Sequence, residues 1–177
     1  PFMASEQAAA VEEGREQGKE IASQKDFMTI SIESATGSMD LLESAMAAAN
    51  EMLPSRADDD KRAGKMFISH GPNTLCLICH VPEEHHTTAT AEDWMKAVLS
   101  GIGGEMISAG ATEAKGEVSR GDASQPFLLP DGSKKDKAET VGFEATKKSV
   151  EWLRERQLFP PKEEEGDDDW EAGDVEW

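Results

Sequence analysis

Cys76 and Cys79 stand two residues apart, and His80 directly follows the second cysteine. At this C-x-x-C-H spacing two thiols can bond the vinyl groups of one haem while the next imidazole binds its iron. Both cysteines of the chain lie here, and all four histidines lie between positions 70 and 86. The sequence therefore predicts a haem or metal site in this segment, built from His70, Cys76, Cys79, His80, His85 and His86.

The run from His70 to Pro82 resembles segments of c-type cytochromes, particularly multihaem ones, in which a histidine and a proline precede C-x-x-C-H and a proline follows it. The resemblance implies a covalently bound haem c, with Cys76 and Cys79 as its thioether anchors and His80 as the proximal iron ligand. The candidates for the sixth iron ligand are His70, His85 and His86. This chain has a single motif, whereas multihaem cytochromes carry several.

A structural zinc ion is the second interpretation of the same residues. Cys76 and Cys79 would form a C-x-x-C knuckle, and two of the four histidines would complete a tetrahedron. The spacing matches no standard zinc finger. A third interpretation has both cysteines as plain buried thiols, with the histidines exposed, and the sequence leaves these alternatives open.

Composition narrows the classes of partner. The chain has 177 residues and a formal charge of −18, from 36 acidic and 18 basic residues. Nucleic acids and anionic membrane surfaces both require clustered Lys and Arg, so the charge argues against binding either of them. It favours a basic protein partner. No apolar run is long enough to span a membrane, and no targeting segment is visible.

The predicted core is thin. Leu, Ile, Val and Phe together make up less than the roughly 20% below which highly charged chains tend to be disordered. We therefore expect long loops, including residues 108–138, and a folded part that depends on a bound group.

Local patterns predict several elements. Alternation of apolar and polar residues over Met28–Ile32 indicates a short strand. Ser38 is suited to cap a helix that Pro54 ends, and Thr90 with Asp93 forms a capping box for another. A third helix is expected over 140–158.

Taken together, these patterns predict a mainly α fold, a small helical domain with long loops and a disordered acidic C-terminal tail. The expected divisions are a weakly structured N-terminal segment (1–37), a helical haem or metal domain (38–158) and the tail (159–177). Trp170 and Trp177, large rings among acids, are predicted to dock on a partner.

The predicted function is electron transfer by one covalently bound c-type haem, without enzymatic activity, to a basic redox partner or within a larger complex. Such haem attachment implies an extracytoplasmic or organellar compartment: periplasm, intermembrane space or lumen. One alternative is a zinc-binding adaptor with the acidic tryptophan-containing tail as a docking peptide. Another is an accessory subunit of a large assembly, ordered by its neighbours.

Overall fold

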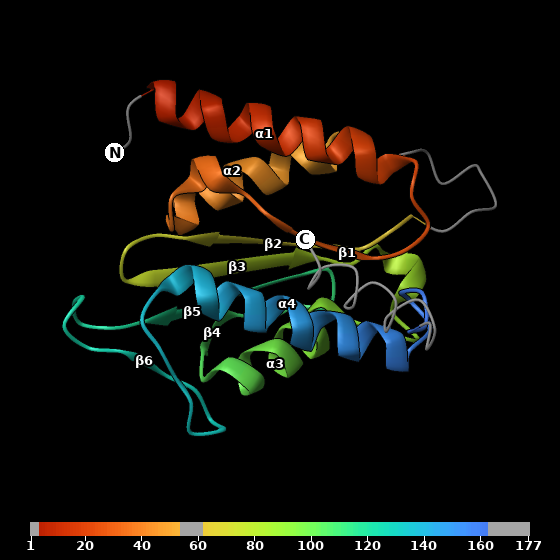
Figure 1. Ribbon diagram of the computed structural model, residues 1–177. Coiled ribbons are helices and arrows are strands. Elements are labelled where there is room, and N and C mark those ends of the chain that lie inside the picture. The colour runs from red at the N-terminus through yellow and green to blue at the C-terminus, as the bar shows by residue number, and fades with distance from the viewer. Residues whose placement is uncertain (1–3, 54–61, 163–177) are drawn as a thin grey trace, which may run out of the picture.

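The computed structural model describes residues 4–53 and 62–162, which form helices packed on both faces of a mixed β-sheet (Figure 1). The helices are α1 (Ala4–Ala22), α2 (Met39–Asn50), α3 (Ala91–Ile102) and α4 (Ala138–Glu155). The sheet contains β1 (Met28–Ser31), β2 (Lys65–His70), β3 (Thr74–His80), β4 (Glu105–Ser108) and β5 (Glu113–Ser119). A small hairpin is made of β6 (Phe127–Leu128) and β7 (Lys134–Lys135), and two short 3-10 turns are η1 (Glu33–Ala35) and η2 (Glu83–His85).

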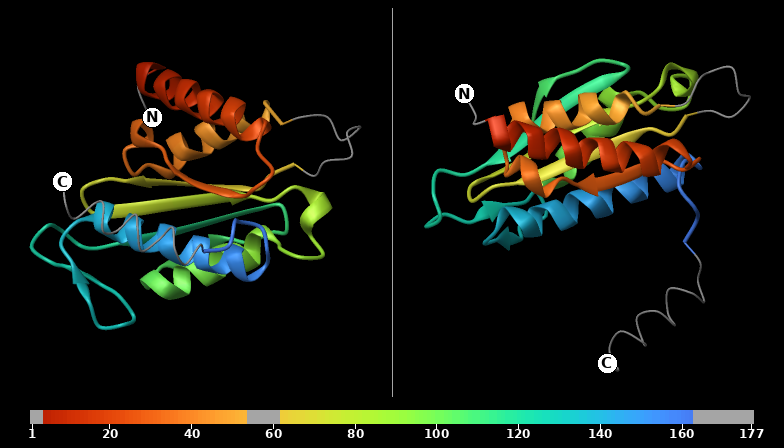
Figure 2. Two further views of the ribbon diagram at one scale, coloured as in Figure 1. Left: turned by 45° about the vertical axis from the view of Figure 1, so that its right-hand side comes forward. Right: turned by 90° about the horizontal axis from the view of Figure 1, so that it is seen from above.

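The five strands follow the order β1-β2-β3-β5-β4, which leaves β1 and β4 at the two edges. β1 runs parallel to β2, and every other neighbouring pair is antiparallel. α2 covers one face and α1 lies on top of α2, whereas α3 and α4 cover the opposite face (Figure 1). Seen from above, α4 runs beside β1 along one side of the molecule (Figure 2).

β3 lies at the centre of the sheet and is buried on both faces. Its residues from Leu75 to Cys79 therefore form a continuous apolar run, and β2 beside it has the shorter run Met66–Ile68, since neither strand has a solvent face that would require alternate polar residues. Side chains of successive strand residues point to opposite faces. Leu75, Leu77 and Cys79 accordingly join the core under α3 and α4, while Cys76 and Ile78 join the core under α2.

α1 packs on α2 through its smallest residues. Ala10, Gly14, Gly18 and Ile21 form its buried stripe. A Cβ added to Gly14 would lie 2.1 Å from the carbonyl oxygen of Ala45, and one added to Gly18 would lie 2.7 Å from the Ala49 Cα. The glycines that weaken the helical pattern in the sequence are thus the residues that let the two backbones approach.

The predicted mainly α class is wrong, because the described residues form a mixed α/β structure with a five-stranded sheet at its centre. Periodicity did not reveal β2 and β3, because strands buried on both faces do not alternate. β5, within the predicted 108–138 loop, buries only Ala114, Gly116 and Val118 on its inner side, and such small residues give little hydrophobic signal.

Other expectations fare differently. The strand near Met28, the helix capped by Ser38 and the helix capped by Thr90 are confirmed, and both caps accept the expected backbone hydrogen bond. The predicted weakly structured segment 1–37 contains α1 and β1. Of the predicted tail 159–177, residues 163–177 lie outside the described residues. Among the described helices, none is long and apolar enough to cross a membrane, as the sequence predicted.

Two glycine-to-alanine substitutions test the packing of α1. Alanine usually stabilises a helix by about 1 kcal/mol relative to glycine. We expect Gly14→Ala nevertheless to destabilise the protein by about 1–3 kcal/mol, because its Cβ collides with the α2 backbone. Gly142→Ala, in α4, is the control: its Cβ would lie 3.4 Å from Leu75 Cδ1, an ordinary contact, so this variant should be as stable as the parent or more so. Urea unfolding measures both, and equal stabilisation by the two alanines would contradict this packing.

Candidate functional site

The two cysteines of the C-x-x-C-H motif lie on β3, on opposite faces of the sheet. Cys76 Sγ donates to the Gly37 carbonyl oxygen at 3.1 Å, above one face. Cys79 Sγ donates to the Ala91 carbonyl oxygen at 3.3 Å, below the other. The two thiols are free and do not pair with each other. Because the motif is a strand and not a helical turn, its two sulfurs cannot face the same haem edge, and the predicted likeness to c-type cytochromes is wrong.

The four histidines are also separated by their roles. His70, at the end of β2, places Nε2 3.6 Å from Glu139 Oε2. His85 Nε2 lies 2.6 Å from the Arg62 carbonyl oxygen, and His86 Nε2 lies 3.0 Å from the Val81 carbonyl oxygen. His80 points to the same face as Cys76. Within residues 4–53 and 62–162, no three His, Cys, Asp or Glu side chains gather as metal ligands would, so the predicted zinc adaptor and haem electron carrier are both overturned.

Burial, and not a ligand, dominates the chemistry of this segment. Desolvation raises the pKa of the Cys76 thiol to about 11, with Glu117 adding to the effect. Desolvation also raises the pKa of Cys79, which is wholly buried. Both thiols are therefore protonated and unreactive at neutral pH, which agrees with the interpretation of plain buried thiols. Trp170 and Trp177, the predicted docking residues, lie outside the described residues.

Beside the motif lies a lysine that the sequence analysis did not single out. Lys65 begins β2, faces His80 across the ladder, and is fully buried. Its Nζ has no hydrogen-bond partner among the described residues, and neither does His80 Nδ1. Desolvation lowers the pKa of Lys65 to about 8, with the charge of Arg62 adding to the effect. Desolvation lowers the pKa of His80 to about 4, helped by the charges of Lys65 and Arg62.

An ion pair holds the chain next to these buried groups. Arg62 Nε and Nη2 each donate to a carboxylate oxygen of Glu84 at 2.9 Å, and the Arg62 backbone N–H donates to Glu84 at 3.0 Å. The guanidinium holds the pKa of the Glu84 carboxyl well below its usual range. His85 donates from Nε2 to the Arg62 carbonyl oxygen and packs edge-on against the Phe27 ring. The pair therefore anchors the start of β2 to η2, which is a structural role.

A hollow that is open to a ligand lies elsewhere, between β1 and α4. A hollow of about 460 Å³, here called the edge hollow, is lined by residues of β1, β2, β3, η1 and α4. Its lining comprises Thr29, Ser31, Glu33, Ile68, His70, Leu75, Glu139, Gly142, Phe143 and Thr146. Phe143 at its rim is 62% exposed, one of three large hydrophobic side chains so exposed among the described residues. The hollow therefore joins an apolar floor to hydroxyl groups and an aromatic wall.

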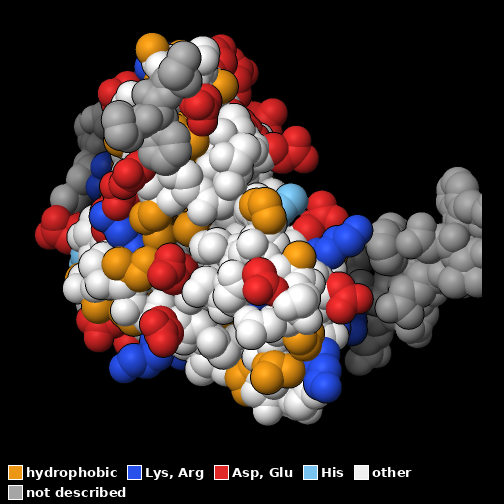
Figure 3. All heavy atoms as spheres, turned by 90° about the vertical axis from the view of Figure 1, so that its left-hand side faces the viewer, with side chains coloured by type: hydrophobic (Ala, Val, Ile, Leu, Met, Phe, Trp, Pro, Cys, Tyr) orange, Lys and Arg blue, Asp and Glu red, His pale blue; other side chains and the backbone are white. Residues whose placement is uncertain are grey.

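A second hollow of about 510 Å³, here called the terminal pocket, adjoins the first at the start of α4. Its lining comprises Thr36, His70, Gly71, Pro72, Arg120, Lys137, Ala138 and Glu139. His70 and Glu139 line both hollows, and their 3.6 Å contact marks the boundary between them. The two hollows together form one groove along α4. Figure 3 looks onto this end of the molecule, where acidic, basic and isolated hydrophobic side chains occur side by side.

The exposed edge of β1 opens onto the same groove. The backbone N–H groups of Met28 and Ile32 donate to β2, at Gly64 and Ile68. The peptide groups of the intervening Thr29 and Ser31 therefore point away from β2, toward the side where no described strand pairs. Because the side chains of Thr29 and Ser31 line the edge hollow, free backbone hydrogen-bonding groups and a hollow coincide. Of the predicted site residues within 4–53 and 62–162, only His70 lines this groove.

Comparisons with known proteins add a distant structural likeness. No protein-family model matches the chain, and no curated protein does. Among solved structures, a crystal structure of the C-Ala domain from Aquifex aeolicus alanyl-tRNA synthetase is similar at 15% identity and a TM-score of 0.43. The match covers 72% of this chain and 89% of that domain. At this distance the likeness carries no inference about this protein.

The opposite placement of the two cysteines predicts how they react. We expect neither thiol of the native protein to react with 5,5′-dithiobis(2-nitrobenzoate) within minutes at pH 7, because burial keeps both protonated. In denaturant both should react, which shows that they are free. Intact mass spectrometry should give the mass of the bare polypeptide. Rapid release of thionitrobenzoate from the native protein would contradict the buried positions.

Stability should depend on pH through Lys65 and His80. Because the folded state lowers both pKa values, it favours the neutral forms. The free energy of unfolding should therefore decrease as the pH is lowered from 10.5 to 8, and decrease again as it is lowered from 6.5 to 4.

Lys65→Met should stabilise the protein by about 1–3 kcal/mol at pH 7 and by less at pH 10. The control is Lys115→Met, which removes a 2.6 Å ion pair with Glu43 and should not stabilise. Urea unfolding at the two pH values measures these differences, and a destabilising Lys65→Met would show that the ammonium has a partner in solution.

Proposed function

We propose that this protein binds an extended peptide segment of a partner, which adds as a strand to the free edge of β1 and places side chains in the edge hollow. The observation that carries this proposal is that Thr29 and Ser31 provide both backbone groups with which no described strand pairs and part of the lining of the hollow. Recognition of this kind draws affinity from backbone hydrogen bonds and specificity from pockets that receive alternate side chains.

The shape of the groove supports a chain segment as its occupant. Ile68 and Leu75 form an apolar floor, Phe143 forms a wall, and the hydroxyl group of Thr146 completes the side made by α4. Gly142 has no side chain to fill the space, although a Cβ there would make only ordinary contacts with Leu75 and Ile68. The glycine therefore leaves space in the lining of the hollow that packing alone does not require.

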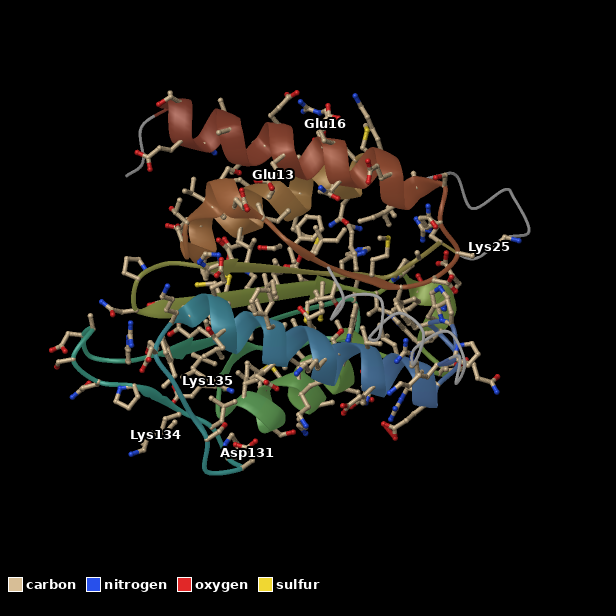
Figure 4. All side chains as sticks on the ribbon, in the orientation of Figure 1. Glu13, Glu16, Lys25, Asp131, Lys134 and Lys135 are labelled. Carbon is tan, nitrogen blue, oxygen red and sulfur yellow. The ribbon has the colours of Figure 1, made fainter. Side chains whose placement is uncertain are left out.

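Charge supports a basic partner and argues against a nucleic acid. The net charge of −18 attracts basic chains over long range and raises their rate of encounter. Glu33 and Glu139 line the edge hollow and bring acids to the groove itself. Figure 4 shows Glu13 and Glu16 on α1, on the far side of the sheet from the hairpin that carries Lys134 and Lys135. The proposed activity is binding, and no chemical step on the partner is part of it.

A proline on the edge strand tests the proposal. Ser31→Pro removes a backbone donor that points away from β2, so it should leave the β1–β2 ladder intact but block strand addition. Ser31→Ala, the matched control, removes the hydroxyl and keeps the donor. Peptides selected from a library of random 12-residue sequences with free C-termini should bind the parent and Ser31→Ala alike, and Ser31→Pro at least about tenfold more weakly. Fluorescence anisotropy measures the three affinities.

A second pair of variants tests the groove without a proline, which could misfold the protein. Phe143→Ala removes the exposed wall of the edge hollow and should weaken the binding of the same peptides. The control, Ile107→Ala, removes another exposed hydrophobic side chain from β4, at the opposite edge of the sheet, and should leave binding unchanged. Selection of no peptide, or of peptides that bind all four variants equally, would refute a peptide-binding groove.

A further inference from the structure

We propose that the terminal pocket receives the C-terminal carboxylate of the bound segment, so that the partner chain ends in the groove. This inference rests on the proposed function and adds to it the chemical class of the segment: a free C-terminus with a basic side chain upstream. Three features support it: the fixed positive charge of Arg120, the position of the terminal pocket relative to β1, and the acidic residues of the edge hollow beside the basic residues of the terminal pocket.

Arg120 supplies a positive charge that the protein holds in place through neutral acceptors; the one carboxyl group that its charge is seen to affect among the described residues is the exposed Asp122, whose pKa it helps to lower after the hydrogen bonds from Ser124. Its Nε donates to Asn73 Oδ1 at 3.0 Å and its Nη2 to the Pro72 carbonyl oxygen at 3.0 Å. Its Nη1 donates to the carbonyl oxygens of Gln125 and Asp136 at 2.8 and 2.7 Å, and the guanidinium lies 4.6 Å from the centroid of the Phe127 ring. All these acceptors are neutral, and no carboxylate among the described residues forms an ion pair with Arg120.

Arg120, which lines the pocket, also retains one unused donor. A guanidinium has five N–H groups, and the four hydrogen bonds above use four of them, which leaves one on Nη2. A carboxylate prefers such charge-assisted donors to neutral ones. Because the other four bonds fix the plane of the guanidinium, the remaining donor is already oriented before a ligand arrives.

Lys137 adds a second charge at the mouth of the pocket. It precedes α4, is exposed, and makes no side-chain hydrogen bond to the helix, whereas Ser38 and Thr90 cap α2 and α3 with theirs. No ion pair to Lys137 occurs in the described part of the chain. The lining of the terminal pocket thus contains Arg120, Lys137 and His70, and Glu139 is the only acidic residue in it.

The direction of β1 points an added strand toward this pocket. β1 and β2 both run toward the turn that holds Gly71 and Pro72, which line the pocket. A segment that pairs in parallel with Thr29 and Ser31 runs toward the same end of the sheet, where His70 and Glu139 line both hollows. Arg120 follows β5, on the far side of β2 and β3 from this edge, so the end of the segment must turn past His70 to reach it. Upstream, the same segment passes Glu33, which favours a basic side chain there.

The experiment compares each selected peptide as a free acid and as its C-terminal amide. On the parent protein the amide should bind at least tenfold more weakly. Lys137→Glu should weaken the free acid at least fivefold and leave the amide unchanged, whereas Lys96→Glu, the same change of charge on an exposed residue of α3, should affect neither. Equal binding of acid and amide would overturn the carboxylate assignment while leaving peptide binding intact.

A second measurement does not depend on finding a peptide. The ¹⁵N-labelled full-length protein is titrated with N-acetylglycine and with N-acetylglycinamide, which differ only in the carboxylate. The acid should shift the amide resonances of Gly71, Ala138 and Glu139 in a saturable manner, and the amide should not. If the acid shifts these resonances but the library yields no binding peptide, the terminal pocket is upheld and strand addition is refuted. Identical responses to the two compounds, or none at these residues, would overturn the carboxylate assignment.

Discussion

The alternation of side chains along β3 is the constraint on which the rest of this structure depends. Its odd-numbered residues Leu75 and Leu77 fill the core under α3 and α4, and its even-numbered residues Cys76 and Ile78 fill the core under α2. A strand that serves two cores must be apolar on both sides, and it can present no pair of residues three apart to one ligand. The same geometry that builds the fold therefore excludes the chemistry that the C-x-x-C-H spacing indicates.

The burial of β2 and β3 also explains the unusual state of the ionisable groups at their shared end. Lys65 and His80 occupy opposing ladder positions on the α2 face, where both side chains are withdrawn from water and the nearby charge of Arg62 is positive. In such surroundings the charged form is disfavoured, so both groups shift toward neutrality, in contrast to Lys115, whose ion pair with Glu43 raises its pKa. The two lysines of the sheet therefore differ because Lys115 forms an ion pair with a carboxylate, whereas Lys65 forms none with the described residues.

Sequence patterns could predict the elements that face solvent on one side. Ser38 and Thr90 mark helix starts through their caps, and the alternation around Met28 marks the edge strand. The patterns failed where burial is complete, in β2 and β3, and where small residues make the contact, as with Gly14 and Gly18 in α1 and Gly116 in β5. The sequence could not predict the groove for another reason. Ser31, Arg120 and Phe143 are distant in sequence, and only the fold places the segments that carry them along one groove. His70 was named for metal binding and lies instead between the two hollows.

The two edges of the sheet differ in a way that bears on the proposed function. Free strand edges promote unwanted association, and proteins commonly block them with charges or irregular pairing. β4 follows this pattern, because its register shifts between Met106 and Ser108 and Glu105 lies exposed at its start. β1 carries no such interruption: it pairs regularly with β2 over all its residues and presents Thr29 and Ser31. α4 runs beside this edge and contributes one side of the hollow next to it (Figure 2). An edge that is regular, uncharged and enclosed on one side is suited to selective pairing, whereas the opposite edge is suited to none.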